Sequence, residues 1–338
     1  MPPLRIAVAS LLCSIALAGC APNVLNAPRP GSFADHPSPP PAGRIELEID
    51  HGILHAVHQS NAVANTPPED LQVWVDHAVA AVSTYYGYFP VEQARLIIEP
   101  VNGSGLQWAR TFAHSGFFIR VGIGSSTTAA QLDSDWMLTH EFVHLTLPTM
   151  ADEHDWLQEG AATYVEPIAR AQAGQLSAER VWSEFVQQMP HGLPGPRDRG
   201  LDFTSRWGRI YWGGALFCLT ADIEIRQQTD NHYGLRDALR AILDSGGTLD
   251  HQWTIREALS VGDRGVGVDV LTELYEKWRA TPVRVDLETL WSELGIRRAG
   301  RGIVFDDGAP LARIRQSITA RSTLADTAGP RPLVLIAD

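Results

Sequence analysis

The sequence predicts an α+β domain with two lobes: a small N-terminal β-sheet lobe at residues 44–125 and a mostly helical lobe at residues 126–295. Before residue 125, most segments alternate or are rich in β-branched and aromatic residues, as strands are. After it, apolar residues recur at three- and four-residue steps in nearly every segment, as they do in helices. Roughly 300 residues follow Ile45, which is enough for one domain with a buried core.

The first residues predict an export signal. A single basic residue, Arg5, precedes an apolar run at residues 6–18 that is shorter than the ~20 residues a membrane-spanning helix needs. The run ends in LAGC, which resembles the bacterial lipobox. That resemblance implies that residues 1–19 are a lipoprotein signal peptide and that Cys20 is lipidated. The protein would then be anchored in the bacterial cell envelope, and Ala21 after the cysteine permits the outer membrane, facing the periplasm or the exterior. An ordinary signal peptide cut after small residues is the alternative.

Composition separates the predicted anchor from the domain and excludes some partners. Residues 20–43 are rich in proline and small residues without an apolar period, so they are predicted to form a flexible tether behind the lipidated cysteine. The chain has a formal net charge of -12, and removal of residues 1–19 deletes only Arg5 and leaves -13. The negative charge disfavours binding to nucleic acid and to anionic lipid. Membrane attachment is therefore expected through acyl chains only.

The sheet lobe is predicted from four strands and one amphipathic helix. The strands are RIELEID (44–50), ARLIIEPV (94–101), LQWARTF (106–112) and GFFIRVGIG (116–124), and the helix is DLQVWVDHAVAAVSTYYGYF (70–89). In the helical lobe, further helices are predicted at about 176–189, 208–228, 234–244, 252–260, 266–279 and 286–293. Residues 296–338 form a C-terminal extension. Cys218 falls on an aliphatic helix face, where a packed thiol is expected rather than a nucleophile.

The segment DWMLTHEFVHLTLP, residues 135–148, is predicted to carry a metal-binding pair. Apolar residues and histidines share one helical face, with candidate N-caps at residues 125–128, and Pro148 should end the helix near Leu147, after roughly five turns. His140 and His144 then project together, one turn apart, which suits two nitrogen ligands of a tetrahedral zinc ion. Glu141 lies about 100 degrees further round the helix, within reach of a water beside the metal. Two core histidines bonded to carbonyls are the alternative.

A third ligand is expected downstream. HDWLQEGAATYVEPIARA, residues 154–171, also has helical periodicity, with Pro167 near its end. Glu159 follows His144 by fifteen positions, which leaves room for a loop and one helical turn. The other carboxylates in reach along the chain are those of the connecting loop, Asp152, Glu153 and Asp155, and that of Glu166, two turns further along the helix.

The two segments HEFVH and WLQEGAATYVE together resemble the gluzincin metallopeptidases. The resemblance implies a thermolysin-like catalytic domain with one zinc ion, held by His140, His144 and Glu159. It also implies that Glu141 is the general base that activates a water for attack on a peptide bond.

A further segment, GRIYWGGALFCLTADIEIRQQTDNHYGLRDALRAIL (208–243), is similar to glycyl-aminopeptidase-like gluzincins. That similarity implies that the hydroxyl of Tyr211 donates a hydrogen bond to the oxyanion of the reaction. Packing of Tyr211 beside Trp207 and Trp212 is the alternative. Many aminopeptidases of this group have a glutamate that holds the substrate's amino group, but residues 105–124 contain Gln107 and His114 and no carboxylate. Exopeptidase action is therefore not expected from this segment, although Asp202 or Glu166 could supply the charge from elsewhere.

The function predicted from these patterns is that of a zinc metallopeptidase acting on a peptide or protein substrate. Two alternatives remain. One is a non-catalytic zinc-site lipoprotein that binds a peptide or envelope partner. The other is a zinc hydrolase with a non-peptide substrate.

Overall fold

The computed structural model describes residues 45–50, 53–59, 67–300, 302–322 and 334–335. The chain divides into two units, Met1–Pro39 and Pro40–Asp338, and all described residues belong to the second. The predicted signal peptide, Cys20 and the tether lie outside the described residues and stay predictions. No described helix has the length and apolar character that a membrane span requires.

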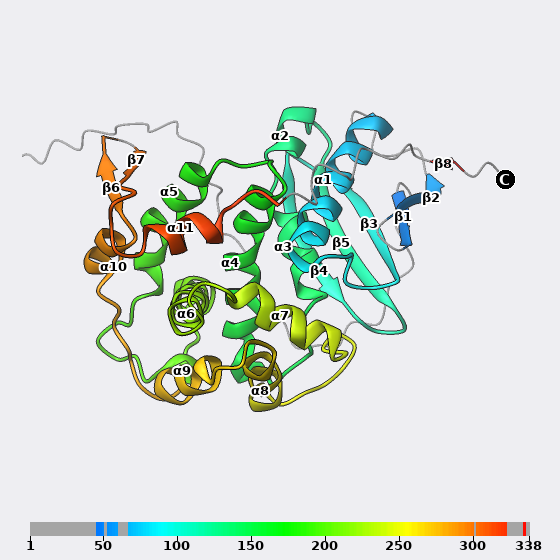
Figure 1. The fold of residues 1–338 in the computed structure, drawn as a ribbon. Helices are drawn as coiled ribbons and strands as arrows, with labels where there is room; N and C mark the ends of the chain where they lie inside the picture. The colour runs from blue at the N-terminus through cyan, green and yellow to red at the C-terminus, as the bar shows by residue number, and fades with distance from the viewer. Residues whose placement is uncertain (1–44, 51–52, 60–66, 301, 323–333, 336–338) are drawn as a thin grey trace, which may run out of the picture. The chain divides into compact units, whose positions relative to one another are not determined.

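A mixed six-stranded sheet forms one side of this unit (Figure 1). Its order is β4-β5-β3-β1-β2-β8. The strands are β1 (Ile45–Asp50), β2 (Ile53–Gln59), β3 (Gln93–Val101), β4 (Leu106–Phe112), β5 (Phe117–Gly124) and β8 (Val334–Leu335). β3 and β5 run parallel, as do β2 and β8, whereas the other neighbouring pairs are antiparallel. The four predicted strands are confirmed as β1, β3, β4 and β5; β2 was not predicted.

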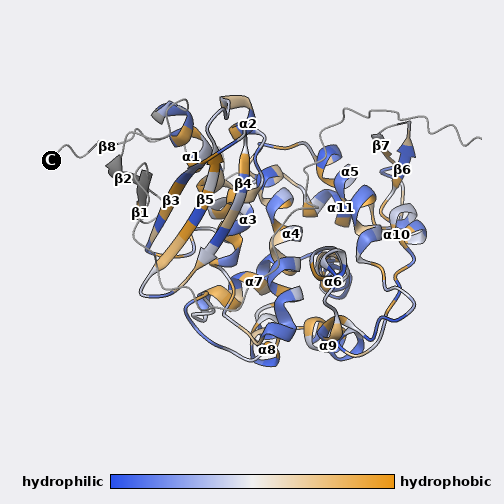
Figure 2. Cartoon of the chain, turned by 180° about the vertical axis from the view of Figure 1, so that it is seen from behind, coloured by the Kyte–Doolittle hydropathy of each residue, from blue (hydrophilic) through white to orange (hydrophobic). Residues whose placement is uncertain are grey.

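Helices cover the sheet and continue away from it as a second layer. Helix α1 (Pro68–Tyr86) lies against the sheet. Strands β3 and β5 each mix hydrophobic and hydrophilic residues, because only some residues of each strand face the core (Figure 2). The buried apolar residues form one continuous core from the sheet into the helices. The remaining helices are α4 (Asp155–Gln172), α5 (Ala178–Gln188), α6 (Trp207–Gln228), α7 (Leu235–Asp244), α8 (Ile255–Val266), α9 (Val270–Trp278), α10 (Leu287–Glu293) and α11 (Ala312–Ile318). The mixed α+β character and the helical second part agree with the sequence prediction.

The segment predicted as one five-turn helix is two helices, so that prediction was wrong. α2 spans Ala129–Asp133 and begins at Thr128, one of the predicted caps, while α3 spans only Met137–His144. The carboxylate of Asp135 starts the second helix, because it accepts the backbone N–H groups of Met137 and Leu138, both at 3.1 Å. After His144 the backbone hydrogen bonds tighten to three-residue steps, from Leu145 N–H to the Phe142 carbonyl (3.2 Å) and from Thr146 N–H to the Val143 carbonyl (3.0 Å).

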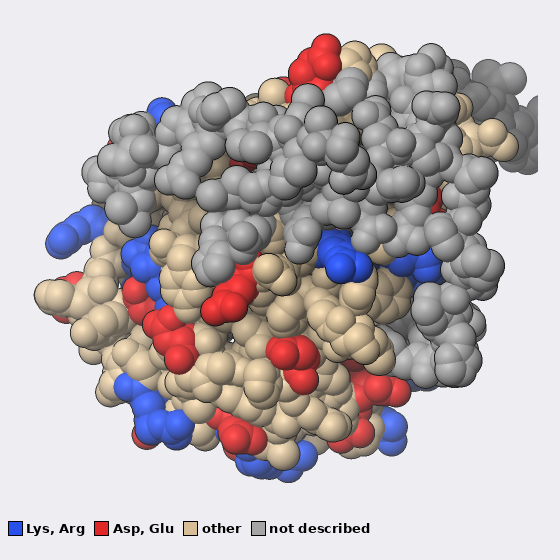
Figure 3. Space-filling view, turned by 90° about the vertical axis from the view of Figure 1, so that its right-hand side faces the viewer, with Lys and Arg blue, Asp and Glu red and all other residues tan. Residues whose placement is uncertain are grey.

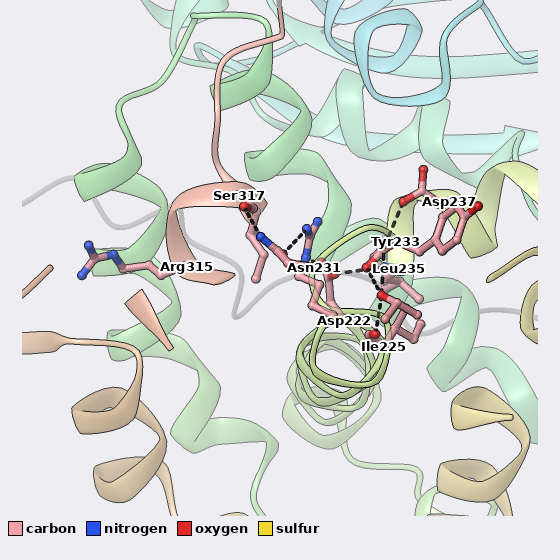
Figure 4. Close-up of polar contacts among 12 residues, drawn as sticks. Asp222, Ile225, Asn231, Tyr233, Leu235, Asp237, Arg315 and Ser317 are labelled. Atoms are coloured by element: carbon pink, nitrogen blue, oxygen red, sulfur yellow. Dashed lines mark hydrogen bonds and ion pairs between the residues drawn. The ribbon is translucent and has the colours of Figure 1, made fainter. Parts of the chain in front are cut away.

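Polar contacts at the far end of α6 hold the C-terminal part of the chain in place. Buried Asp222 accepts hydrogen bonds from the Tyr164 hydroxyl (2.8 Å), the Arg226 guanidinium (2.7 Å) and the backbone N–H of Leu235 (2.9 Å). Asn231 donates to the Ser317 hydroxyl of α11 at 2.8 Å, as Figure 4 shows.

Beyond α10, strands β6 (Ile296–Ala299) and β7 (Gly302–Phe305) form an antiparallel hairpin. The residues predicted as the C-terminal extension therefore include a hairpin and a helix.

The described surface carries both signs of charge. On the face drawn in Figure 3, acidic and basic side chains are interspersed over the described part, and neither sign forms one continuous field there.

Candidate metal centre

The structure brings His140, His144 and Glu159 together. His140 and His144 lie on α3, and Glu159 lies on α4. One potential ligand atom from each lies within 4.8 Å of the others, and among the described residues this is the one group of three such side chains so close together. Nε2 of His140 is 3.2 Å from Oε2 of Glu159, and Nε2 of His144 is 3.7 Å from the same oxygen.

These separations fit a tetrahedral zinc ion. Bonds of about 2.0–2.1 Å to nitrogen and oxygen place two tetrahedral ligands about 3.3–3.5 Å apart, and the measured 3.2 and 3.7 Å lie close to this range. The two imidazole rings are nearly perpendicular, at 83°, with their centroids 4.9 Å apart. Two nitrogens and one carboxylate oxygen are also the donor set of catalytic zinc sites, which keep a fourth position open.

The electrostatics of the group match what a metal requires of its ligands. Burial lowers the pKa of His144 and thereby favours the neutral imidazole. Burial alone would raise the pKa of Glu159, but His144 and His140 beside it hold that pKa below its ordinary value. One contact is missing from the usual pattern. Nδ1 of His140 is buried and has no hydrogen-bond partner among the described residues, whereas ligand histidines commonly donate this second N–H.

Glu141 lies beside the group but outside it. Its side chain is buried, with 9% of the residue exposed. The Thr111 hydroxyl on β4 is within hydrogen-bonding distance of the Glu141 carboxylate, at 2.7 Å, and of its main-chain oxygen, at 2.9 Å. Burial raises the pKa of Glu141 above its ordinary value, and both His144 and the Thr111 hydrogen bond oppose that shift.

Tyr211 reaches the same place from α6. Its ring stacks on Trp207, with centroids 5.0 Å apart, and lies 6.1 Å from the His140 ring, nearly parallel to it. Burial, together with the nearby carboxylate of Glu159, raises the pKa of Tyr211. Tyr211 therefore both packs on Trp207 and lies close to the candidate metal centre.

A close contact between two helices sets the position of Glu159 relative to Tyr211. Gly160 of α4 faces Gly214 of α6, and a Cβ atom added to Gly160 would lie 2.3 Å from the Cα of Gly214. A Cβ added to Gly214 would lie 2.0 Å from the main-chain oxygen of Trp156. Only glycine permits this approach. Glu159 directly precedes the first glycine, and Tyr211 lies one turn before the second.

The four other carboxylates considered as the third metal ligand lie outside the close group. Asp152 and Glu153 are exposed in a short 3-10 helix before α4. Asp155 is the first residue of α4 rather than part of the connecting loop. Glu166 is buried against Arg170 at 2.9 Å. None of the four belongs to the close group.

The residues considered for binding a substrate amine are also placed. Gln107 and His114 are exposed at the start of β4 and after its end. Asp202 is occupied, since it accepts hydrogen bonds from Trp156 Nε1 at 2.9 Å and the Tyr275 hydroxyl at 3.0 Å and lies 3.2 Å from His154 Nδ1. Cys218 is a buried free thiol whose pKa burial raises, in agreement with the predicted packed thiol.

Sequence reasoning missed Thr111 and the two glycines at the helix contact. The pairs Glu159-Gly160 and Gly213-Gly214 were visible, and glycine inside a helical pattern is a signal of close packing. Nothing along the chain connects Thr111 with Glu141, thirty positions away.

Comparisons with known proteins add little to this geometry. No protein-family model and no curated protein was found to match the sequence. Among solved structures, the fold is similar to a two-domain M1 zinc metallopeptidase bound to L-arginine, at 16% identity and a TM-score of 0.40 over 72% of this chain and 54% of that one. It is also similar to the M1 zinc metallopeptidase from Deinococcus radiodurans, at 18% identity and a TM-score of 0.39 over 72% and 55% of the two chains. The chain thus spans about half the length of these proteins, and so distant a likeness carries no conclusion about activity.

Proposed function

We propose that the protein is a zinc-dependent metallopeptidase. The observation that supports this most is the convergence of His140, His144 and Glu159 at separations that suit one zinc ion, with a buried carboxylate, Glu141, next to them. Two imidazole nitrogens and one carboxylate oxygen that converge on one point are a donor set that zinc takes in catalytic sites, where a fourth position stays open for water or substrate. The general base and a tyrosine hydroxyl beside such a centre are what a hydrolase requires and what a purely structural metal site does not.

In this proposal each residue has a separate task. Bound zinc would supply a Lewis acid that acidifies water and polarises a carbonyl. Glu141 takes a proton from the attacking water and passes it to the leaving amine, because its carboxylate is the base next to the ligand pair. Tyr211 donates its hydroxyl hydrogen to the substrate oxygen that becomes negative.

We also propose internal cleavage rather than removal of N-terminal residues. Asp202 and Glu166 already have partners within the fold, so neither offers a free carboxylate to a substrate ammonium. Acetylation of the N-terminus of a good substrate should therefore change kcat/KM less than roughly tenfold. Abolished cleavage would instead indicate an aminopeptidase. Asp155, which lies one turn before Glu159 on α4, would then be the first carboxylate to test.

The proposed setting is the bacterial cell envelope. The LAGC motif supports lipidation of Cys20 and attachment by acyl chains, probed below. The net charge of -12 supports a peptide or protein substrate rather than nucleic acid.

A peptide-library digest tests the activity directly. The purified protein is incubated with the library after removal of metal, after restoration of zinc, and as Glu141→Gln with zinc. We expect cleavage only by the zinc-loaded natural sequence, while Glu141→Gln binds zinc and cleaves poorly. Zinc binding without any cleavage would favour one of the alternatives, a binding protein or a hydrolase of another substrate class, and an assay panel of ester and epoxide substrates would separate them.

A further inference from the structure

We infer that Thr111 is a positioning residue for Glu141, whose carboxylate its hydroxyl holds in one orientation. The inference rests on the proposed function, in which Glu141 carries a proton between water and the leaving amine. It concerns a residue of the sheet, outside both helices that form the candidate centre.

The contact is specific in its atoms. Oγ1 of Thr111 lies 2.7 Å from Oε2 of Glu141 and 2.9 Å from the main-chain oxygen of the same residue. Among the described side chains, Thr111 is the one hydrogen-bonded to the Glu141 carboxylate, which is otherwise buried. A carboxylate with several free rotamers would be a poorly placed base, and this hydroxyl selects one of them.

The sheet places Thr111 against α3. Thr111 lies on β4, opposite Ile119 in the antiparallel pairing with β5, and Ile119 is fully buried. β4 is the end strand of the sheet order and packs directly against α3. The side chains of a strand alternate between its two faces, so Thr111 points to the α3 side while its neighbours Arg110 and Phe112 point to the other.

The test compares three variants of the full-length protein. Thr111→Val keeps the shape of the side chain and removes the hydroxyl, Thr111→Ser keeps the hydroxyl, and Thr111→Ala is a second variant without it should valine prevent folding. We expect Thr111→Val to lower kcat roughly tenfold or more, with KM and zinc content within about threefold of the natural protein. Thr111→Ser should have a kcat within about threefold of that of the natural protein. Unchanged kcat in Thr111→Val, an equal loss in Thr111→Ser, or a loss of zinc in step with activity would each overturn the inference.

A second measurement does not depend on activity. Thermal unfolding of the metal-free protein is recorded for Thr111→Val, Glu141→Ala and the double variant. If the two side chains interact as inferred, the two single shifts in Tm add to a value that differs from that of the double variant by roughly 2 °C or more. Additive shifts would refute the contact. If the natural protein cleaves no peptide, the proposed function fails, but this cycle still decides whether Thr111 holds Glu141.

Discussion

Replacement of Gly214 by alanine is expected to force apart the two helices that carry Glu159 and Tyr211. The added Cβ atom would lie 2.0 Å from the main-chain oxygen of Trp156 and 2.7 Å from the Cα of Gly160. Both are backbone atoms, so no side-chain rotation relieves the clash. An ordinary contact of 3.4 Å requires the Cβ and the oxygen to separate by about 1.4 Å.

The size of the effect follows from this displacement. Overpacking in a core costs about 1–3 kcal/mol, and in a domain of this size each kcal/mol lowers Tm by about 2–4 °C. We therefore expect Tm to fall by roughly 2–12 °C. If α4 moves, the 3.2 Å separation between Glu159 and His140 changes by up to about 1 Å, and zinc affinity should weaken at least tenfold. If α6 moves, Tyr211 leaves Glu159, and turnover falls while zinc affinity stays.

Two measurements separate these outcomes. Thermal unfolding followed by circular dichroism gives Tm, and competition with a chromophoric chelator gives zinc affinity. The matched control is Gly302→Ala on β7, where the nearest heavy atom to the new Cβ is 4.0 Å away, so Tm should not fall. A Tm for Gly214→Ala within about 1 °C of the natural protein, with unchanged zinc affinity and turnover, would refute the idea that this contact sets the geometry of the centre.

Three further predictions concern the ligand, the anchor and a buried ion pair. Glu159→Ala should lower zinc content in the purified protein, and full occupancy would place the third ligand elsewhere. Cys20→Ser should move the protein out of the membrane fraction on cell fractionation, and unchanged retention would count against lipidation. The pKa of Glu166 is raised to about 7, chiefly by burial, with Arg170 opposing the shift. Because the folded state holds this proton more tightly than the unfolded state, the stability that the protonated carboxyl contributes is complete below about pH 4.5 and is lost as pH rises to about 7. The difference in Tm between Glu166→Gln and the natural protein should thus shift in favour of the variant as pH rises from 5 to 8. The control is Glu92→Gln at an exposed position, where no such change is expected. A Tm difference for Glu166→Gln that stays constant with pH would contradict the prediction.

Periodicity predicted the type of most elements well, because each depends on local side-chain spacing. Helices α4 and α6 differ from their predicted bounds by one residue. The error at α2 and α3 has a local cause that periodicity does not register. Periodicity predicts one continuous helix through Asp135, whereas its carboxylate accepts the first two backbone N–H groups of a new helix and is also held by Trp74 Nε1 at 2.9 Å. That second contact crosses sixty-one positions of sequence and depends on the tertiary fold.

The chemistry-bearing residues of the candidate centre were visible in the sequence, but the contacts that fix their geometry were not. A spacing of four positions already places His140 and His144 on one face of a helix. The distance from that face to Glu159 depends on how α3 and α4 pack, and the approach of Tyr211 depends on a contact between Gly160 and Gly214. A hydroxyl from the sheet, Thr111, fixes the remaining carboxylate.

These supporting residues fix the geometry of the partly buried candidate centre. Each candidate catalytic or ligand side chain lies on a different rigid element from at least one of its neighbours, so any relative movement of α3, α4, α6 or β4 changes the group. The backbone contact at Gly214 restricts sliding of α6 along α4, because the main-chain oxygen of Trp156 leaves no room for a side chain. The Thr111 hydrogen bonds tie β4 to α3 in the same way. It follows that substitutions at Gly214 and Thr111, which carry no charge and bind no metal, should alter zinc affinity or turnover separately, whereas removal of a ligand should abolish both together.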